Sequence, residues 1–360
     1  MKSRMCTINR CAITCCLVLC LGCFAVAQTY TITDLGVLSG DSASFGTGIS
    51  PSGLIVGCSD TSAGNTFPCS AGVPGHAFLW SKTGGMQDLG VLSGGTFSAA
   101  YAVNDSKQVV GFSLDPQNKV EAFRWTNASG MTKLVTLPNA SYSVAGGVNS
   151  HGDIGGSCNS GTSNGKIFAV LWTNNGAKIQ KLPPLPHAVI TLGGGINESG
   201  ESAGVASFNR TFTKLHGFKW TKANGTVDLG TLPGGANSNV NGINSTGTIT
   251  GYATTHAYPL GVAVIWNNSG KIRKLGTLSG DSSSAGNGIN DLGQVVGSSS
   301  TSTASRAFLW TSKKGMQDLN TLIPVNSGWT LIYASSTNAK GQITGYGTVN
   351  GQNHAFLLTP

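Results

Sequence analysis

Short apolar runs recur along most of the chain, separated by clusters of Gly, Asn, Ser and Asp. Residues 98–137 show the pattern clearly, with apolar or small runs at 99–104, 108–114, 121–126 and 131–137. The residues in the breaks tolerate left-handed backbone or bond their own main chain, as tight turns require. Because no long helical period competes, the pattern predicts four antiparallel strands in each stretch of about 46 residues.

One unit of this kind repeats seven times. Six of the seven tryptophans occupy one position of the unit, at intervals of 44 to 48 residues: Trp80, Trp125, Trp172, Trp220, Trp266 and Trp310. Leu358 holds that position in the seventh copy. An Asn-x-x-Gly segment followed by an apolar pair and Gly, clearest in residues 290–297, precedes this position, with Ser50 in place of the asparagine in the first copy and Lys107 in place of the first glycine in the second. Asp-Leu-Gly or a relative follows most copies of the position. Units of this size cannot bury a core alone, so neighbouring units must cover one another.

We therefore predict an all-β fold, a seven-bladed β-propeller of four-stranded blades. A β-helix is the main alternative, but its coils are usually shorter and do not need two alternating hairpin turns. In a propeller the adjacent blade buries the recurrent tryptophan, which fits a charged fraction of only 10%. The chain after the predicted cleavage site begins with the element that forms the outer, fourth strand of a unit, and it ends with a third strand. Residues 30–35 are therefore predicted to close the ring beside 355–358.

Residues 1–27 have the pattern of a signal peptide: three basic residues, an apolar run and Ala-Val-Ala. We predict cleavage before Gln28, with residues 28–360 forming a single seven-repeat domain. Lipoprotein cleavage before Cys23 and an uncleaved anchor are the alternatives, although the apolar run is short for a membrane span. Cleavage lowers the net charge from +8 to +5 and implies a secreted or extracellular protein, with the periplasm or outer surface as alternative locations.

Three cysteines remain after such cleavage. Cys58 and Cys69 lie in the first copy, where the interval from Ser50 to Asn104 is 54 residues, against 45 to 48 between the equivalent positions of later copies. The extra residues fall between the second and third strands, where these two cysteines lie. In an oxidising compartment we expect a Cys58–Cys69 disulfide, with Cys158 left as a thiol.

Few residues offer chemistry at a recognisable spacing. The bases are scattered, so no nucleic-acid partner is expected. No metalloprotease, calcium-loop or nucleophile-elbow motif occurs, and we expect no metal and no cofactor. The repeat position of His76, His216 and His354 holds Glu, Phe, Val or Arg in other copies, which indicates a structural role. Asp88 and its equivalents, replaced by lysine in three copies, suit a solvated strand edge.

The variable loops supply the remaining candidates for binding. Connections from strand two to three and from strand four to the next strand one leave the propeller on the same rim and vary in length. We take their polar and aromatic residues as candidate ligand contacts: Asp41, Asp60, Asp115, Asn237, Tyr258, Asp281 and Trp329. Trp329 lies outside the repeated tryptophan position and either faces a sugar ring or packs in the core.

Residues 76–80, His-Ala-Phe-Leu-Trp, and 354–358, His-Ala-Phe-Leu-Leu, resemble the signature of the HAF-type extracellular repeat family. The Ile-Asn-x-x-Gly-x-Val-Val-Gly and Asp-Leu-Gly-x-Leu elements also match, over roughly residues 30–360. The full His-Ala-Phe triplet occurs only in the first and last copies. The resemblance implies an exported bacterial protein without an established activity, and it adds no catalytic residue.

These observations favour a non-catalytic scaffold that binds glycans or cell-surface proteins. Asn, Asp and aromatic loop residues suit sugar hydroxyls, and seven similar surfaces suit multivalent binding. The first alternative is a polysaccharide-cleaving enzyme whose carboxylates come from Asp41, Asp60, Asp115 and Asp281. The second is a structural envelope component. We expect a monomer without a membrane span after signal cleavage.

Overall fold

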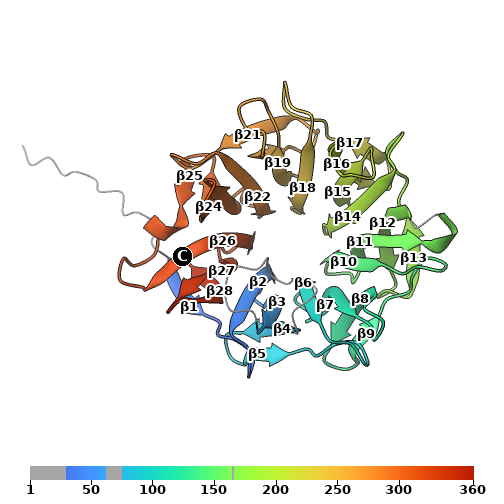
Figure 1. Cartoon of the computed structure of the whole chain (residues 1–360), viewed down its shortest axis with the longest axis horizontal. Helices are drawn as coiled ribbons and strands as arrows, with labels where there is room; N and C mark the ends of the chain where they lie inside the picture. The colour runs from blue at the N-terminus through green and yellow to red at the C-terminus, as the bar shows by residue number, and fades with distance from the viewer. Residues whose placement is uncertain (1–29, 62–74, 164–165) are drawn as a thin grey trace, which may run out of the picture.

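The computed structural model describes residues 30–61, 75–163 and 166–360, which form a ring of seven four-stranded antiparallel sheets (Figure 1). The fold is therefore the predicted seven-bladed β-propeller. The proposed signal peptide, residues 1–27, lies outside the described residues. No helix in the part of the chain that the structure describes is long and apolar enough to cross a membrane.

Each blade runs from an inner strand at the axis to an outer strand at the rim. Blade 1 comprises β2 (Ala43–Ile49), β3 (Ile55–Asp60), β4 (Gly75–Ser81) and β5 (Gly85–Asp88); blade 2 comprises β6 (Ser98–Val103), β7 (Val109–Leu114), β8 (Val120–Thr126) and β9 (Gly130–Lys133). Blade 3 comprises β10 (Ser143–Val148), β11 (Ile154–Ser160), β12 (Lys166–Thr173) and β13 (Lys178–Lys181); blade 4 comprises β14 (Ile190–Ile196), β15 (Ser202–Ser207), β16 (Leu215–Thr221) and β17 (Gly225–Asp228). Blade 5 comprises β18 (Ser238–Ile243), β19 (Ile249–Ala253), β20 (Val262–Trp266) and β21 (Ile272–Gly276); blade 6 comprises β22 (Ser283–Ile289), β23 (Val295–Ser300), β24 (Ser305–Thr311) and β25 (Gly315–Asp318). Blade 7 comprises β26 (Trp329–Thr337), β27 (Ile343–Val349), β28 (Gln352–Thr359) and β1 (Thr31–Asp34), and two short 3-10 turns, η1 (Gly161–Ser163) and η2 (Leu319–Thr321), join strands.

The outer strands are shorter than the sequence pattern predicts. In blade 2 the apolar run 131–137 predicts a longer strand, yet β9 ends at Lys133. The next residue, Leu134, still donates its main-chain N–H to the Ala122 carbonyl, and its side chain is buried in the core between blades. The chain leaves the sheet at this point because the leucine of this element turns inward.

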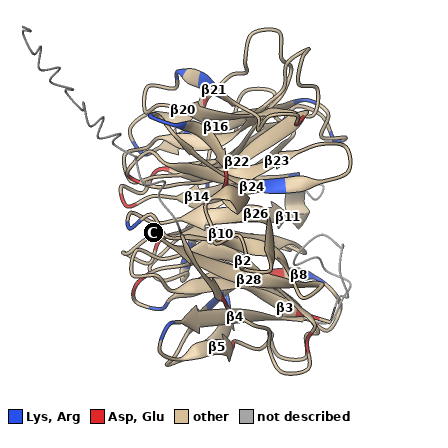
Figure 2. Ribbon diagram, turned by 90° about the vertical axis from the view of Figure 1, so that its left-hand side faces the viewer, with Lys and Arg blue, Asp and Glu red and all other residues tan. Residues whose placement is uncertain are grey.

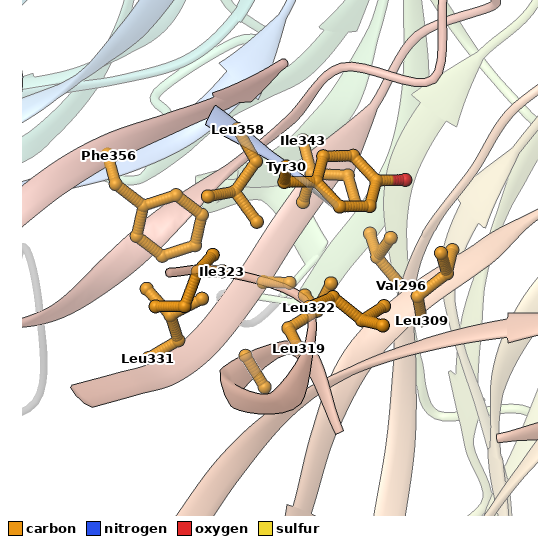
Figure 3. Close-up of a cluster of buried hydrophobic side chains, with 12 residues drawn as sticks. Tyr30, Val296, Leu309, Leu319, Leu322, Ile323, Leu331, Ile343, Phe356 and Leu358 are labelled. Carbon is orange, nitrogen blue, oxygen red and sulfur yellow. The ribbon is translucent and has the colours of Figure 1, made fainter. Parts of the chain in front are cut away.

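The first and last strands of the chain close the ring, as predicted. Strand β1 pairs with β28 in antiparallel register, from Thr31 opposite Thr359 to Asp34 opposite Phe356. Just before β1, Tyr30 is 1% exposed and joins a cluster of apolar side chains from blades 6 and 7 (Figure 3). The amino-terminal residues therefore complete blade 7 and also hold it against blade 6.

The recurrent tryptophans pack between neighbouring blades, as the fold prediction required. All six are less than 9% exposed. Trp125 of blade 2 packs with Val56 and Leu79 of blade 1, and Trp266 of blade 5 packs with Ala203 of blade 4. The indole N–H of Trp266 also donates to the Leu229 carbonyl in blade 4, at 3.0 Å.

A β-bulge interrupts every inner strand and explains one repeated glycine. In β2 the register shifts between Gly46 and Gly48, and each other inner strand shifts near the equivalent place. The bulge brings the Phe45 carbonyl over Gly57 on the second strand, where a Cβ atom would overlap it. The Gly of the Val-Val-Gly element is thus required by the bulge.

The turn asparagines join the blades as well as forming turns. In blade 2 the Asn104 Oδ1 accepts from the main-chain N–H groups of Ser106 and Gln108, which confirms the turn interpretation. Its Nδ2 donates to the Asn149 carbonyl in blade 3, at 2.9 Å. The bond to the next blade recurs around the ring: Asn149 to Asn197, Asn197 to Asn244, Asn244 to Asn290, Asn290 to Asn338 and Asn338 to Ser50. We call these six residues, Asn104 to Asn338, the asparagine ring.

The two cysteines within the described residues have different environments. Cys58 is disulfide-bonded. Cys69 lies outside the described residues, so the Cys58–Cys69 pairing stays a prediction. Cys158 is a buried free thiol, as predicted, and burial raises the pKa of this thiol. Its Sγ accepts the Leu137 N–H at 3.4 Å, as Ser113 Oγ accepts the equivalent leucine N–H in blade 2.

Replacing this thiol by a hydroxyl should be tolerated. We expect Cys158→Ser to change the unfolding free energy by less than about 1 kcal/mol, because three other copies have serine at this position and make the same bond. Cys158→Ala removes the acceptor for a buried N–H and should cost about 1–3 kcal/mol. Urea denaturation of both variants tests this order, and equal losses would contradict it.

Candidate functional site

A cavity of about 500 Å3 lies on the axis of the ring, lined mainly by inner strands and also by Ser298, Ser305 and Tyr346 from strands farther out. A second hollow of about 260 Å3 continues along the axis toward the asparagine turns. Five side chains line both: Thr47, Tyr101, Asn241, Asn287 and Ser335. Phe45, Tyr333 and Tyr346 line the first hollow only. We call the two hollows together the axial cavity.

The bulges place these five side chains on the axis. Each is the residue that its bulge leaves unpaired in the ladder. The residue before this position and the two after it are only Gly, Ala, Ser, Val, Ile or Thr in all seven copies. The bulge position itself differs from blade to blade: Thr47, Tyr101, Gly146, Gly194, Asn241, Asn287 and Ser335. Residues that recur in every copy serve packing that is common to all blades. Within this part of the inner strands, the bulge position is therefore where the blades present different side chains.

The axial cavity carries no charge. Among the described residues that line it there is no Asp, Glu, Lys, Arg or His. Burial, with a smaller effect of nearby Tyr142, raises the pKa of Tyr101 to about 12. Burial and the neighbouring Tyr346 raise the pKa of Tyr333 to about 12. Both phenols are neutral at physiological pH, so the cavity suits an uncharged ligand.

Aromatic rings form one wall of the cavity. Tyr333 and Tyr346 of blade 7 stack with ring centroids 5.6 Å apart, and Phe45 of blade 1 meets Tyr346 edge-on at 5.1 Å. Tyr101 of blade 2 rests on Phe112, with centroids 5.8 Å apart. Asn241 and Asn287 come from blades 5 and 6, on another side of the ring. A ligand in the cavity therefore meets aromatic rings on one side and amides on another.

The loop residues predicted as ligand contacts do not line the axial cavity. Asp41 is half-buried before β2, and Asp60 is buried at the end of β3. The Asp115 Oδ1 accepts the main-chain N–H groups of two residues in its own turn. The Asn237 Oδ1 accepts the Leu215 N–H at 2.9 Å. Asp115 and Asn237 thus shape their loops.

The other three candidates also have packing partners. Asp281, with a side chain 1% exposed, pairs with Arg306 at 2.8 Å. Tyr258 packs against the core between blades 4 and 5. Trp329 begins β26 and meets Phe356 edge-on, with centroids 6.2 Å apart. The structure brings none of the four acids of the enzyme alternative into the axial cavity.

The repeated histidines pair with the Asp-Leu-Gly aspartates. His76 Nδ1 lies 2.9 Å from Asp88, and His216 and His354 make the same contact in blades 4 and 7. In blade 2 the signs are reversed, with Glu121 2.7 Å from Lys133. The sequence interpretation, which placed these aspartates at a solvated strand edge, missed this pairing. The signal was in the sequence, because His with Asp at these two repeat positions in blade 1 is replaced by Glu with Lys in blade 2. Charged residues are spread over both rims of the ring (Figure 2).

No protein-family model matches the chain, and no curated protein matches it. Solved structures with a similar fold include a streptogramin B lyase (TM-score 0.54, 11% identity, covering 92% of this chain and 99% of the lyase). A catalytically inactive virginiamycin B lyase from Staphylococcus aureus with quinupristin has a TM-score of 0.53 at 12% identity, covering 92% of this chain and 99% of its own. A puromycin hydrolase mutant complexed with PGG has a TM-score of 0.53 at 12% identity, over 87% of this chain and 50% of the hydrolase. At these identities the likeness extends to the propeller fold alone.

Proposed function

We propose that this protein is an exported propeller that binds neutral glycans in its axial cavity without cleaving them. The observation that carries the proposal is an uncharged cavity lined by aromatic rings, amides and hydroxyls. Aromatic faces stack on the apolar faces of sugar rings, while amides and hydroxyls bond sugar hydroxyls. Export rests on the amino-terminal signal pattern and on the resemblance to HAF-type repeats.

The same cavity argues against glycoside hydrolysis there. Retaining and inverting glycosidases usually place two carboxyl groups on either side of the scissile bond. The described residues that line the axial cavity supply none. The propeller that holds quinupristin is described as a lyase, and that activity is a property of that protein. It supports this proposal only by showing a ligand on the same fold.

A glycan array with the chain 28–360 tests the proposal. We expect binding to at least one neutral glycan, and Tyr101→Ala to weaken it up to about tenfold, because a stacked aromatic contact contributes about 0.5–1.5 kcal/mol and about 1.4 kcal/mol is a factor of ten. Tyr258→Ala, a tyrosine on a loop outside the cavity, is the matched control and should leave affinity within about twofold. Glycan binding lost in the control and kept in Tyr101→Ala would move the site to the loops. Release of shorter products would identify an enzyme.

A further inference from the structure

Four consecutive blades, 5, 6, 7 and 1, direct one polar side chain each from the bulge into the axial cavity. Each of these side chains donates to a main-chain carbonyl of the next blade: Asn241 to Gly286 (2.9 Å), Asn287 to Ala334 (3.0 Å), Ser335 to Gly46 (2.6 Å) and Thr47 to Ala100 (2.7 Å). We call Asn241, Asn287, Ser335 and Thr47 the acceptor arc.

These bonds determine what the arc offers a ligand. A carbonyl oxygen only accepts, so each amide must turn its NH2 group to the wall and keep its Oδ1 for another partner. The second Asn241 proton points to Asn287 Oδ1 at 3.5 Å, and the single hydroxyl protons of Ser335 and Thr47 are committed to carbonyls. Of the donor protons on these four side chains, only one amide proton of Asn287 has no acceptor among the described residues. The arc therefore presents mainly hydrogen-bond acceptors.

The rest of the ring leaves room beside the arc. At the bulge position, blades 3 and 4 have Gly146 and Gly194, so no side chain fills the axis there. Blade 2 contributes the ring of Tyr101. A ligand is thus bounded by the aromatic side chains of blades 7, 1 and 2 and by the acceptor arc, with backbone on the remaining side.

We propose that the acceptor arc recognises the hydroxyl donors of a neutral sugar, with Asn241 and Asn287 as specificity-determining residues. This inference rests on the proposed function and states which sugar groups are bound. A ligand that offers only acceptors leaves the arc's oxygens unpaired and desolvated, which is costly. An anion meets the same acceptors along the arc, and no cationic side chain among the described lining residues balances its charge. An ammonium ion donates, but no carboxylate among the described lining residues compensates its charge.

The test compares free and methylated hydroxyls on one sugar. Calorimetry first selects the tightest binder for the chain 28–360 among cellohexaose, mannohexaose, xylohexaose and galactohexaose. Its per-O-methyl ether retains the ring faces but has no O–H donor. We expect the ether to bind at least about 100-fold more weakly, as two or more lost hydrogen bonds imply.

Two variants then locate the acceptors. Asn241→Ser and Asn287→Ser keep a donor for the neighbouring carbonyl, as Ser335 does in blade 7, but replace the amide oxygen on Cγ with a hydroxyl oxygen on Cβ, one bond nearer to the main chain and shorter in its reach into the cavity. We expect each to weaken sugar binding about tenfold at an unchanged melting temperature. Asn239→Ser is the matched control, because Asn239 lies on the same strand, contacts Tyr252 and does not line the cavity. It should bind like the unsubstituted chain.

The outcomes separate this inference from the function on which it rests. If none of the four sugars, and no glycan on the array, binds, the proposed function itself fails. If a sugar binds and its methyl ether binds equally well, the acceptor arc is not the recognition element, and sugar binding stands. If both serine variants bind the sugar as tightly as the unsubstituted chain does, the acceptor arc is likewise not the recognition element. Binding of hexylammonium with no sugar binding would overturn both proposals.

Discussion

A chain that begins at residue 36 should be at least about 5 kcal/mol less stable than the chain 28–360 and should aggregate. It lacks β1, which pairs four residues with β28, and the buried side chains of Tyr30 and Leu35. Full burial of one large apolar side chain contributes about 1.5–3 kcal/mol, and the bare edge of β28 is a template for pairing with other chains. Chemical denaturation and light scattering measure both effects.

A rearranged chain controls for the loss of sequence. Residues 30–35 can follow Pro360 through a short Gly-Ser linker, because Thr31 lies opposite Thr359 and the connection becomes a hairpin like those between strands three and four elsewhere. This variant should recover most of the lost stability. A shortened chain that stays monomeric with unchanged unfolding would show that β1 does not close the ring in solution.

Replacing one member of the asparagine ring should lower the free energy of unfolding by about 3 kcal/mol. In Asn149→Ala, the main-chain N–H groups of His151 and Asp153 lose their acceptor, and the Asn197 carbonyl loses its donor. Asn149 is 2% exposed, so water does not readily replace these bonds, and each unpaired buried group costs about 1–3 kcal/mol. Urea unfolding gives the loss directly.

Serine at the same position separates the turn from the bond between blades. Ser50 occupies it in blade 1, where its Oγ accepts the Leu54 N–H at 3.2 Å. Asn149→Ser should therefore keep part of the turn and lose the contact to blade 4, with about half the destabilisation of alanine. Equal stability of the unsubstituted chain and the alanine variant would show that the ring contributes nothing measurable.

Comparison among the seven copies separates structural residues from candidate functional ones. The tryptophans, the turn asparagines and the glycine opposite the bulge recur because every blade packs on its neighbour in the same way. The bulge position does not recur, although its neighbours do. In a repeat protein, a variable position inside a uniform strand is thus a useful signal for a binding site, and the sequence interpretation did not use it.

The sequence alone determined the number of blades, the closure of the ring and the buried tryptophans. These features depend on local patterns, namely strand-length apolar runs, turn residues and the order of the elements, which repeat seven times and so reinforce one another. The free thiol of Cys158 followed from the same repeat spacing.

Only the tertiary structure decided which side chains reach the axis. Side chains along a regular strand point alternately to the two faces of the sheet, so a residue's position in the strand gives its face. The extra residue of a bulge reverses the faces of the residues that follow it. Alternation alone therefore does not place Thr47 or Asn241. The bonds that orient the Asn241 and Asn287 amides join blades about 46 residues apart in the chain. Such contacts arise when neighbouring blades pack on one another, and no local pattern encodes them.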